Sequence, residues 1–339
     1  MNRALTLFLG LAVAVIVCWL LQVLKFVFLP LVLAVFISFL LSPLVAWLHK
    51  RRVPLILAVT LCILLTLAVI YALGTIVLQG LVSFQDEFPK YELRFREMAA
   101  QVEDLLHLEY GPLARERIQR ELAALSLSSI VGSTLNSFFS FLIYLLFTFV
   151  FVIYFLLGNP RLPDKIRRAF DPERAVAVNE AIDNIGRQVQ RYIMAKTLTS
   201  FITGAIMLII CLLFGVDFAV TWGFFTFLLN FIPTLGVLMA SIPAVLTALI
   251  QYASWVYALW LALTLAAVMI ALGQFIEPRI LGESVDLSPL VTLFSLIFWG
   301  WLWGPAGMLV AVPVTALIRF TCVHVESLRP LGVLMSGEA

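Results

Sequence analysis

The chain has 339 residues, of which 63% are apolar and only 12% are charged. A soluble domain carries about 25% charged residues and roughly 45–50% apolar ones, so a soluble fold of this size could not bury so much apolar surface. The formal net charge of +2 leaves no basic excess for a nucleic-acid partner. Lipid is therefore the expected solvent, and we predict an all-α, multi-pass membrane protein.

Charge-free runs of about 20 residues, the length that spans the hydrocarbon core, follow one another along the chain. Two much longer charge-free stretches occupy the C-terminal half. We expect about seven or eight transmembrane segments in all. The runs in chain order are Leu5–Leu24, Phe26–Leu48, Leu55–Val82, Ile130–Leu157, Thr197–Val216, Phe218–Ile276 and Leu287–Ile318.

Two polar segments interrupt these runs and predict six regions along the chain. The first polar segment is expected to form amphipathic helices outside the membrane, broken at Gly111-Pro112, and the second a cytoplasmic helix. The predicted regions are scaffold spans (1–83), extracytoplasmic helices (84–129), a fourth span (130–158), a cytoplasmic helical segment (159–196), a C-terminal region with the remaining spans (197–322) and a cytoplasmic tail (323–339).

The distribution of charge predicts the orientation of the chain. Lys and Arg concentrate at residues 49–52, in the segment 159–191 and in the tail at Arg319 and Arg329, whereas residues 84–128 hold nine acidic against six basic side chains. By the positive-inside rule, both termini are expected in the cytoplasm. Lys196, at the start of the fifth span, is expected to reach toward the headgroups.

The C-terminal region contains two similar stretches, which begin at Val216 and Val285. Each opens with Val-Asp, has a Gly/Pro break near its middle and ends in Thr-Ala-Leu. In the first stretch, the apolar pieces on either side of the break are 14 and 15 residues long. Each would extend about 21 Å as a helix, which is short of the roughly 30 Å hydrocarbon core.

These lengths favour two re-entrant hairpins, 218–250 and 287–320, on either side of one full span, 252–276. Because a single span reverses the side of entry, the hairpins would form an inverted repeat with tips near the membrane midplane, where transporters place their substrate. The competing interpretation makes each stretch two full, tilted spans.

Polar residues within the apolar runs are the candidates for chemistry. Asn230, Gln274 and Glu277 could bind a cation or hydrogen-bond a polar solute. Alternatively, Asn230 caps freed backbone at a hairpin tip and Glu277 pairs with Arg279. The equivalent acids Asp217 and Asp286 are expected to cap the hairpin starts, with a proton or sodium role as the alternative.

Other chemistries lack their motifs in this sequence. There is no G-x-x-x-x-G-K-[ST] phosphate loop and no H-E-x-x-H zinc motif, and the three His residues are scattered. The four Cys residues lie in or next to apolar runs, which is typical of core residues. We therefore expect neither an enzyme nor a bound metal or cofactor.

Four motifs follow one another along nearly the whole chain: FISFLLSPLVAWLHKRRVP, NFIPTLG with a downstream IPAVLTAL, QFIEPRILGESVDLSPL, and WGWLWGPAGMLVAVPVTAL. In this order they resemble the AI-2E (autoinducer-2 exporter, PerM-like permease) family. The positions in these motifs that the resemblance implies for substrate or ion binding are Asn230, Pro233, Gly236, Gln274, Glu277, Pro278, Gly304 and Gly307.

The resemblance implies an inner-membrane secondary transporter that exports a small polar solute such as the quorum signal autoinducer-2. It also implies an elevator-type motion and a homo-oligomer, for which a pentamer has been proposed. Two alternatives remain open: a Na⁺/H⁺ antiporter that uses Glu277, and a membrane scaffold that does not transport.

Overall fold

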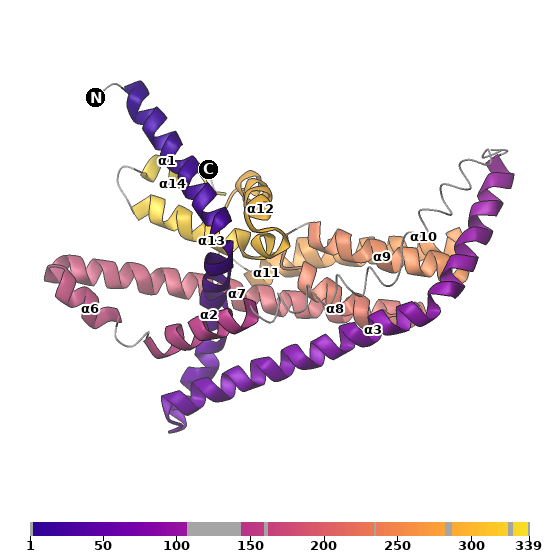
Figure 1. Ribbon diagram of the computed structural model, residues 1–339, viewed down its shortest axis with the longest axis horizontal. Coiled ribbons are helices and arrows are strands. Elements are labelled where there is room, and N and C mark those ends of the chain that lie inside the picture. Colours follow the sequence, from indigo (N-terminus) through magenta and orange to yellow (C-terminus); the bar gives the residue numbers. More distant parts are fainter. Residues whose placement is uncertain are drawn as a thin grey trace. The chain divides into compact units, whose positions relative to one another are not determined.

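The computed structural model describes residues 3–106, 144–158, 162–233, 235–281, 287–324 and 328–337. Helices make up nearly all of these residues, and none of them lies in a strand (Figure 1). The helices are α1 (Arg3–Val23), α2 (Lys25–Lys50), α3 (Leu55–Leu106), a segment without a label (Tyr144–Gly158), α6 (Leu162–Ala169), α7 (Pro172–Leu213), α8 (Ala219–Leu229), α9 (Leu235–Tyr252), α10 (Trp255–Ala271), α11 (Glu277–Leu281), α12 (Pro289–Trp303), α13 (Pro305–His324) and α14 (Arg329–Leu334).

Six helical stretches among the described residues are long and apolar enough to cross a membrane. They lie in α2, α3, α7, α9, the path from α10 to α11, and α13. Four apolar helices are shorter: Phe8–Val23, Tyr144–Gly158, Ala219–Leu229 and Pro289–Trp303. The two short helices of the C-terminal half, α8 and α12, are the first arms of the two predicted hairpins.

The exposed surface of α10 shows why lipid must surround this fold. Only Ala258, Leu261 and Leu265 of this charge-free helix are buried. Large apolar side chains cover the rest of its surface. More than half of the surface is exposed for each of Trp255, Val256, Leu259, Trp260 and Leu263. Exposing so large an apolar surface to water is unfavourable, so lipid must cover it. The prediction of an all-α, multi-pass membrane protein is confirmed.

The chain divides into two compact units. Unit 1 contains Met1–Thr66, Tyr144–Leu198 and Pro278–Ala339, and unit 2 contains Leu67–Ile143 and Thr199–Glu277. The hairpin α8–α9 therefore belongs to unit 2, and the hairpin α12–α13 belongs to unit 1. The chain passes between the units four times: within α3, between Ile143 and Tyr144, within α7, and just after a π-helical turn that follows α10.

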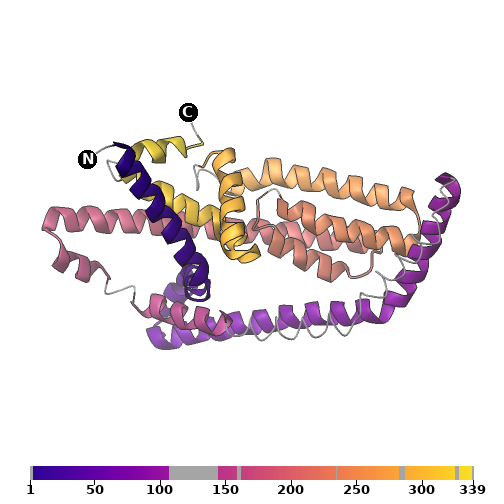
Figure 2. The same ribbon diagram turned by 45° about the horizontal axis from the view of Figure 1, so that its top comes forward.

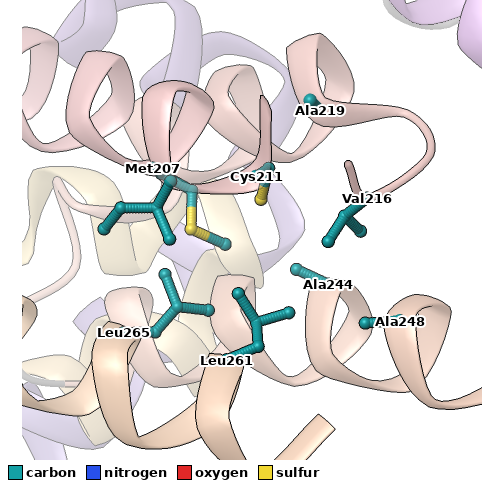
Figure 3. Packing of buried hydrophobic residues seen from close by; sticks show 9 residues of the cluster. Met207, Cys211, Val216, Ala219, Ala244, Ala248, Leu261 and Leu265 are labelled. Carbon is teal, nitrogen blue, oxygen red and sulfur yellow. The ribbon is translucent and has the colours of Figure 1, made fainter. Parts of the chain in front are cut away.

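In unit 2, the core is formed by α7, α8, α9 and α10 around small side chains. Met207 and Cys211 of α7 face Leu261 and Leu265 of α10, and Ala244 and Ala248 of α9 lie beside them, with Ala219 at the start of α8 completing the cluster (Figure 3). Alanine at these positions lets the α8 and α9 backbones come close, which is how helices pack when lipid supplies no hydrophobic driving force.

In unit 1, one core joins α2, the start of α3 and Tyr144–Gly158 through Ala34, Ala58 and Val152, all of which are fully buried. A second contact region holds α14 against the hairpin α12–α13. The amide of Ser288, just before α12, donates to the carbonyl oxygen of Met335 at 3.1 Å, so the tail lies against the base of that hairpin.

The ends of two helices differ from the sequence-based expectations. The predicted boundary at residue 83 falls inside α3, which is continuous from Leu55 to Leu106, and the predicted boundary at 196 falls inside α7. Figure 1 shows α3 bending in its second half, where Pro89 removes a backbone donor. A change from apolar to polar composition marks the membrane surface, and it does not end a helix.

The first two predicted spans are joined without a reversing turn. Only Leu24 separates α1 from α2, and its backbone (φ −90°, ψ 19°) lies in the bridge region next to the helical one. Val27 and Phe28 both donate to the Leu24 carbonyl oxygen, so α2 continues from α1 with a bend (Figure 1). The runs 5–24 and 26–48 therefore do not form the antiparallel pair that two successive full spans require.

Candidate functional site

The tip of the α8–α9 hairpin lies between Leu229 and Leu235. Asn230 is the C-cap residue of α8, and the turn that follows contains Pro233, which has no N–H to continue the helix. Gly236 then packs directly on α8, because a Cβ atom at this position would overlap the carbonyl oxygen of Leu229. Only glycine permits so close an approach of the two arms.

The tip of the α12–α13 hairpin is a single residue, Gly304. Its backbone angles of φ 71° and ψ −153° lie in a region that is essentially restricted to glycine. Three residues later, Gly307 packs on the carbonyl oxygen of Trp299, where a Cβ atom would overlap it. Both tips thus have a glycine three residues after the break, at Gly236 and Gly307, that allows the arms to touch.

Buried polar side chains gather at the tip of the α8–α9 hairpin. Asn230 is 4% exposed, and its Nδ2 donates to Oγ of Ser200 on α7 at 3.1 Å. Thr199, Thr203 and Thr226 are buried nearby on the same two helices. The hydroxyls of Thr203 and Thr226 donate to carbonyl oxygens of their own helices, each at 2.8 Å.

A close contact between α7 and α8 brings this amide and hydroxyl together. A Cβ atom on Gly204 would lie 2.7 Å from the carbonyl oxygen of Gly223, and one on Gly223 would lie 2.9 Å from that of Gly204. The two backbones therefore touch. Ser200 is one helical turn from Gly204, and Asn230 is two turns from Gly223, so both lie on the faces that this contact brings together.

The predicted residues Gln274, Glu277 and Pro278 lie on a separate feature of the fold. Residues Leu272–Ile276 form a π-helical turn between α10 and α11. Gln274 and Pro278 are exposed there, and Glu277 is half-buried. Pro278 has no amide hydrogen for the helical ladder, which favours irregular hydrogen bonding in the preceding turn. Such π turns are often found at functional sites.

Asp217 does not cap α8 as predicted. The N-cap residue is Phe218, and the Asp217 carboxylate instead accepts a hydrogen bond from the Tyr91 hydroxyl at 2.6 Å, with Nζ of Lys90 at 4.0 Å. The turn around it is further held by Gln251, whose Oε1 accepts from the Asp217 amide at 2.9 Å and whose Nε2 donates to the Gly215 carbonyl oxygen at 2.9 Å. Asp217 therefore belongs to a polar cluster at the closed base of the hairpin.

The predicted cap at the start of α12 is also a different residue. Ser288 is the N-cap, and its hydroxyl accepts from the Val291 amide at 3.2 Å, with Pro289 in the first turn. Asp286, the predicted cap, lies outside the described residues. A Ser-Pro pair before an apolar run is a recognised N-terminal signal, and it was available in the sequence.

Of two buried polar residues of α7, Ser200 was missed by sequence reasoning and Lys196 was predicted in the wrong environment. Ser200 is fully buried and bonds to the hairpin tip, and Lys196, one turn earlier, is only 2% exposed and so does not reach toward the headgroups as expected. The spacing of Lys196, Thr199, Ser200 and Thr203 at intervals of three and four places them on one helix face. That pattern could have revealed a polar face turned toward protein.

The fold defines a polytopic helical membrane protein, and polar side chains at the tip of a broken helical hairpin are typical of membrane transporters. The chain belongs to the AI-2E transporter family: the model for "AI-2E family transporter" matches residues 7–325. It is 31% identical to the "AI-2 transport protein TqsA" of Escherichia coli K12 over 91% of this chain and 88% of that protein. A "Putative transport protein" of Haemophilus influenzae is 30% identical over 92% and 90% of the two chains.

Proposed function

We propose that this protein exports a small polar solute of the autoinducer-2 type across the bacterial inner membrane by elevator-type alternating access. Support comes from its family and from its similarity to TqsA, which is named for AI-2 transport. In this proposal, the C-terminus is cytoplasmic and the hairpins α8–α9 and α12–α13 are re-entrant. The solute binds at the tip of α8–α9, with Asn230 as its principal hydrogen-bonding partner.

The length of α7 between the base and the tip of the α8–α9 hairpin is the observation that carries this proposal. The base of the hairpin lies at the end of α7, where Gln251 and Tyr252 bond to the carbonyl oxygen of Gly215 at 2.9 Å. The tip bonds to Ser200, thirteen residues before Leu213, which is about 20 Å along a helix. A hairpin whose base is at one membrane surface would therefore end about 10 Å short of the other surface.

The location of the acidic side chains favours a polar solute over a cation at this tip. The described buried polar side chains there are the Asn230 amide, several hydroxyls and, one turn earlier on α7, the side chain of Lys196, whereas Asp217 lies about 20 Å away at the base of the hairpin. Sodium sites are built from several oxygen ligands and commonly include a carboxylate. An amide with neighbouring hydroxyls is better suited to hydrogen-bond hydroxyl and carbonyl groups of an organic solute.

Flux through the purified protein tests the proposed function. Liposomes with the protein and loaded with autoinducer-2 should release it faster than protein-free liposomes, with a rate that saturates with concentration. Asn230→Ala should reduce that flux at least about tenfold, as expected when a site without a carboxylate loses its main hydrogen-bonding group. A wild-type flux equal to that of empty liposomes, for every solute and ion tried, would instead favour a membrane scaffold.

A further inference from the structure

The hydrogen bond between Ser200 and Asn230 joins the hairpin tip to a different helix. Ser200 is 0% exposed and Asn230 is 4% exposed, and Nδ2 of Asn230 donates to the serine Oγ at 3.1 Å. By contrast, the hydroxyls of Thr203 and Thr226 bond within their own helices. Ser200 thus links α7 to Asn230, the residue at which α8 ends.

This link restricts the orientation of the amide. A free carboxamide turns readily about its last side-chain bond, and its oxygen and nitrogen ends have opposite hydrogen-bonding roles. When the nitrogen end is tied to Ser200, the plane of the amide is fixed and the carbonyl oxygen accepts from one direction. A solute that binds to this amide then meets an oriented partner, which lowers the entropic cost of binding.

The helix contact beside this pair makes the link rigid. Gly204 and Gly223 place the backbones of α7 and α8 in direct contact, so the distance between Ser200 and the end of α8 has little freedom to vary. Gly236 fixes the other arm by packing on Leu229, the residue before Asn230. The amide is therefore held at the end of a short helix whose position is set on two sides.

We propose that Ser200 is a positioning residue of the transport site, which orients the Asn230 carboxamide for the solute. This inference rests on the proposed function and adds to it a residue that acts through Asn230. It requires that Ser200 affects solute affinity only while Asn230 is present.

A double-mutant cycle on autoinducer-2 efflux from liposomes tests this role. Ser200→Ala should raise the half-saturation concentration about tenfold and change the maximal rate less than about twofold, because one orienting hydrogen bond is lost. In an Asn230→Ala background, the same change should have no further effect. Ser200→Thr, which keeps the hydroxyl, should restore most of the affinity.

Ser241→Ala is the matched control, because the Ser241 hydroxyl donates to the Val237 carbonyl oxygen of its own helix at 2.8 Å. It should leave the half-saturation concentration unchanged, and a single gel-filtration peak should show that each variant is folded. If wild type transports but Ser200→Ala binds normally, or weakens binding equally with and without Asn230, the positioning role is wrong and the proposed function stands. If wild type itself shows no flux, both are overturned.

Discussion

At the scale of single residues, glycines determine the geometry of both hairpin tips. Gly304 is needed because its φ is positive. Gly236 and Gly307 lie within helices and are needed because a carbonyl oxygen of the other arm occupies the place of a Cβ atom. Positive φ and close backbone approach are two different reasons for a glycine. From the sequence alone, both look like an ordinary helix break. The position of each break was predictable from its Gly/Pro content, but the reason for each glycine needed coordinates.

Gly304→Ala should destabilise the protein by about 1–3 kcal/mol, because an L side chain is strained at φ 71° and ψ −153°. Thermal unfolding in detergent would measure this as a lower midpoint. Gly74→Ala is the control, since a Cβ atom there meets nothing within 4 Å and the residue lies inside α3. That change should be neutral or stabilise by up to about 1 kcal/mol. Equal midpoints for Gly304→Ala and wild type would contradict the assigned backbone angles.

Glu277→Gln separates the two transport hypotheses. The half-buried carboxylate of Glu277 follows the π turn and is the candidate proton or sodium carrier of an antiporter. For a solute exporter, the isosteric amide should weaken autoinducer-2 flux less than about tenfold, whereas an antiporter should lose exchange altogether. Sodium-driven proton movement, followed with a pH dye, gives the readout. The exposed residue Glu180 provides the control variant, Glu180→Gln.

At the scale of helices, the contact between α7 and α8 holds the α8–α9 hairpin in place. It depends on Gly204 and Gly223, which lie in uninterrupted apolar runs where the sequence offers no reason to single them out. The hairpin arms also have unequal lengths, 11 and 18 residues, although the sequence predicted 14 and 15. The predicted first arm was too long because residues at both of its ends, although apolar, lie in the α7–α8 turn and in the turn at the tip.

Gly204→Ala should destabilise unit 2 by about 1–3 kcal/mol, because the new methyl group would lie 2.7 Å from a backbone oxygen that cannot move without shifting α8. Gly186→Ala on the same helix is the control, since its Cβ would make an ordinary 3.5 Å contact with the Phe39 ring. The midpoint of thermal unfolding should fall for the first variant and stay near wild type for the second. The opposite order would mean that α7 and α8 are farther apart.

Trp303 links the second hairpin tip to another helix, as Asn230 does for the first. Its Nε1 donates to the carbonyl oxygen of Leu21 at 3.1 Å, close to the bend at Leu24, where the helical ladder of α1 ends. Trp299 is also buried and donates to Thr315, whereas Phe298 and Trp301 point outward. The aromatic residues at the end of α12 are therefore divided between buried contacts and exposed surface.

At the scale of the whole molecule, composition was enough to predict a multi-pass helical membrane protein, and the order of the apolar runs matched most of the helices. The sequence did not reveal how elements are grouped. The predicted transport region, 197–322, contains elements of both compact units, because α8–α9 packs with α7 and α10 while α12–α13 packs with α14 and α1. Such groupings depend on contacts between distant residues, which local apolar patterns do not encode.

The most direct test of the account is the side from which each hairpin tip can be reached. In a variant whose four native cysteines are replaced by alanine, Pro233→Cys and Pro305→Cys can each be labelled in inverted and right-side-out vesicles with a membrane-impermeant maleimide. Gln251→Cys, at the base of the α8–α9 hairpin, reports the outer face. We predict that Pro233→Cys is labelled only from outside and Pro305→Cys only from the cytoplasm. If either tip instead reacts only from the face opposite to the predicted one, that hairpin spans the bilayer and the proposed mechanism is wrong.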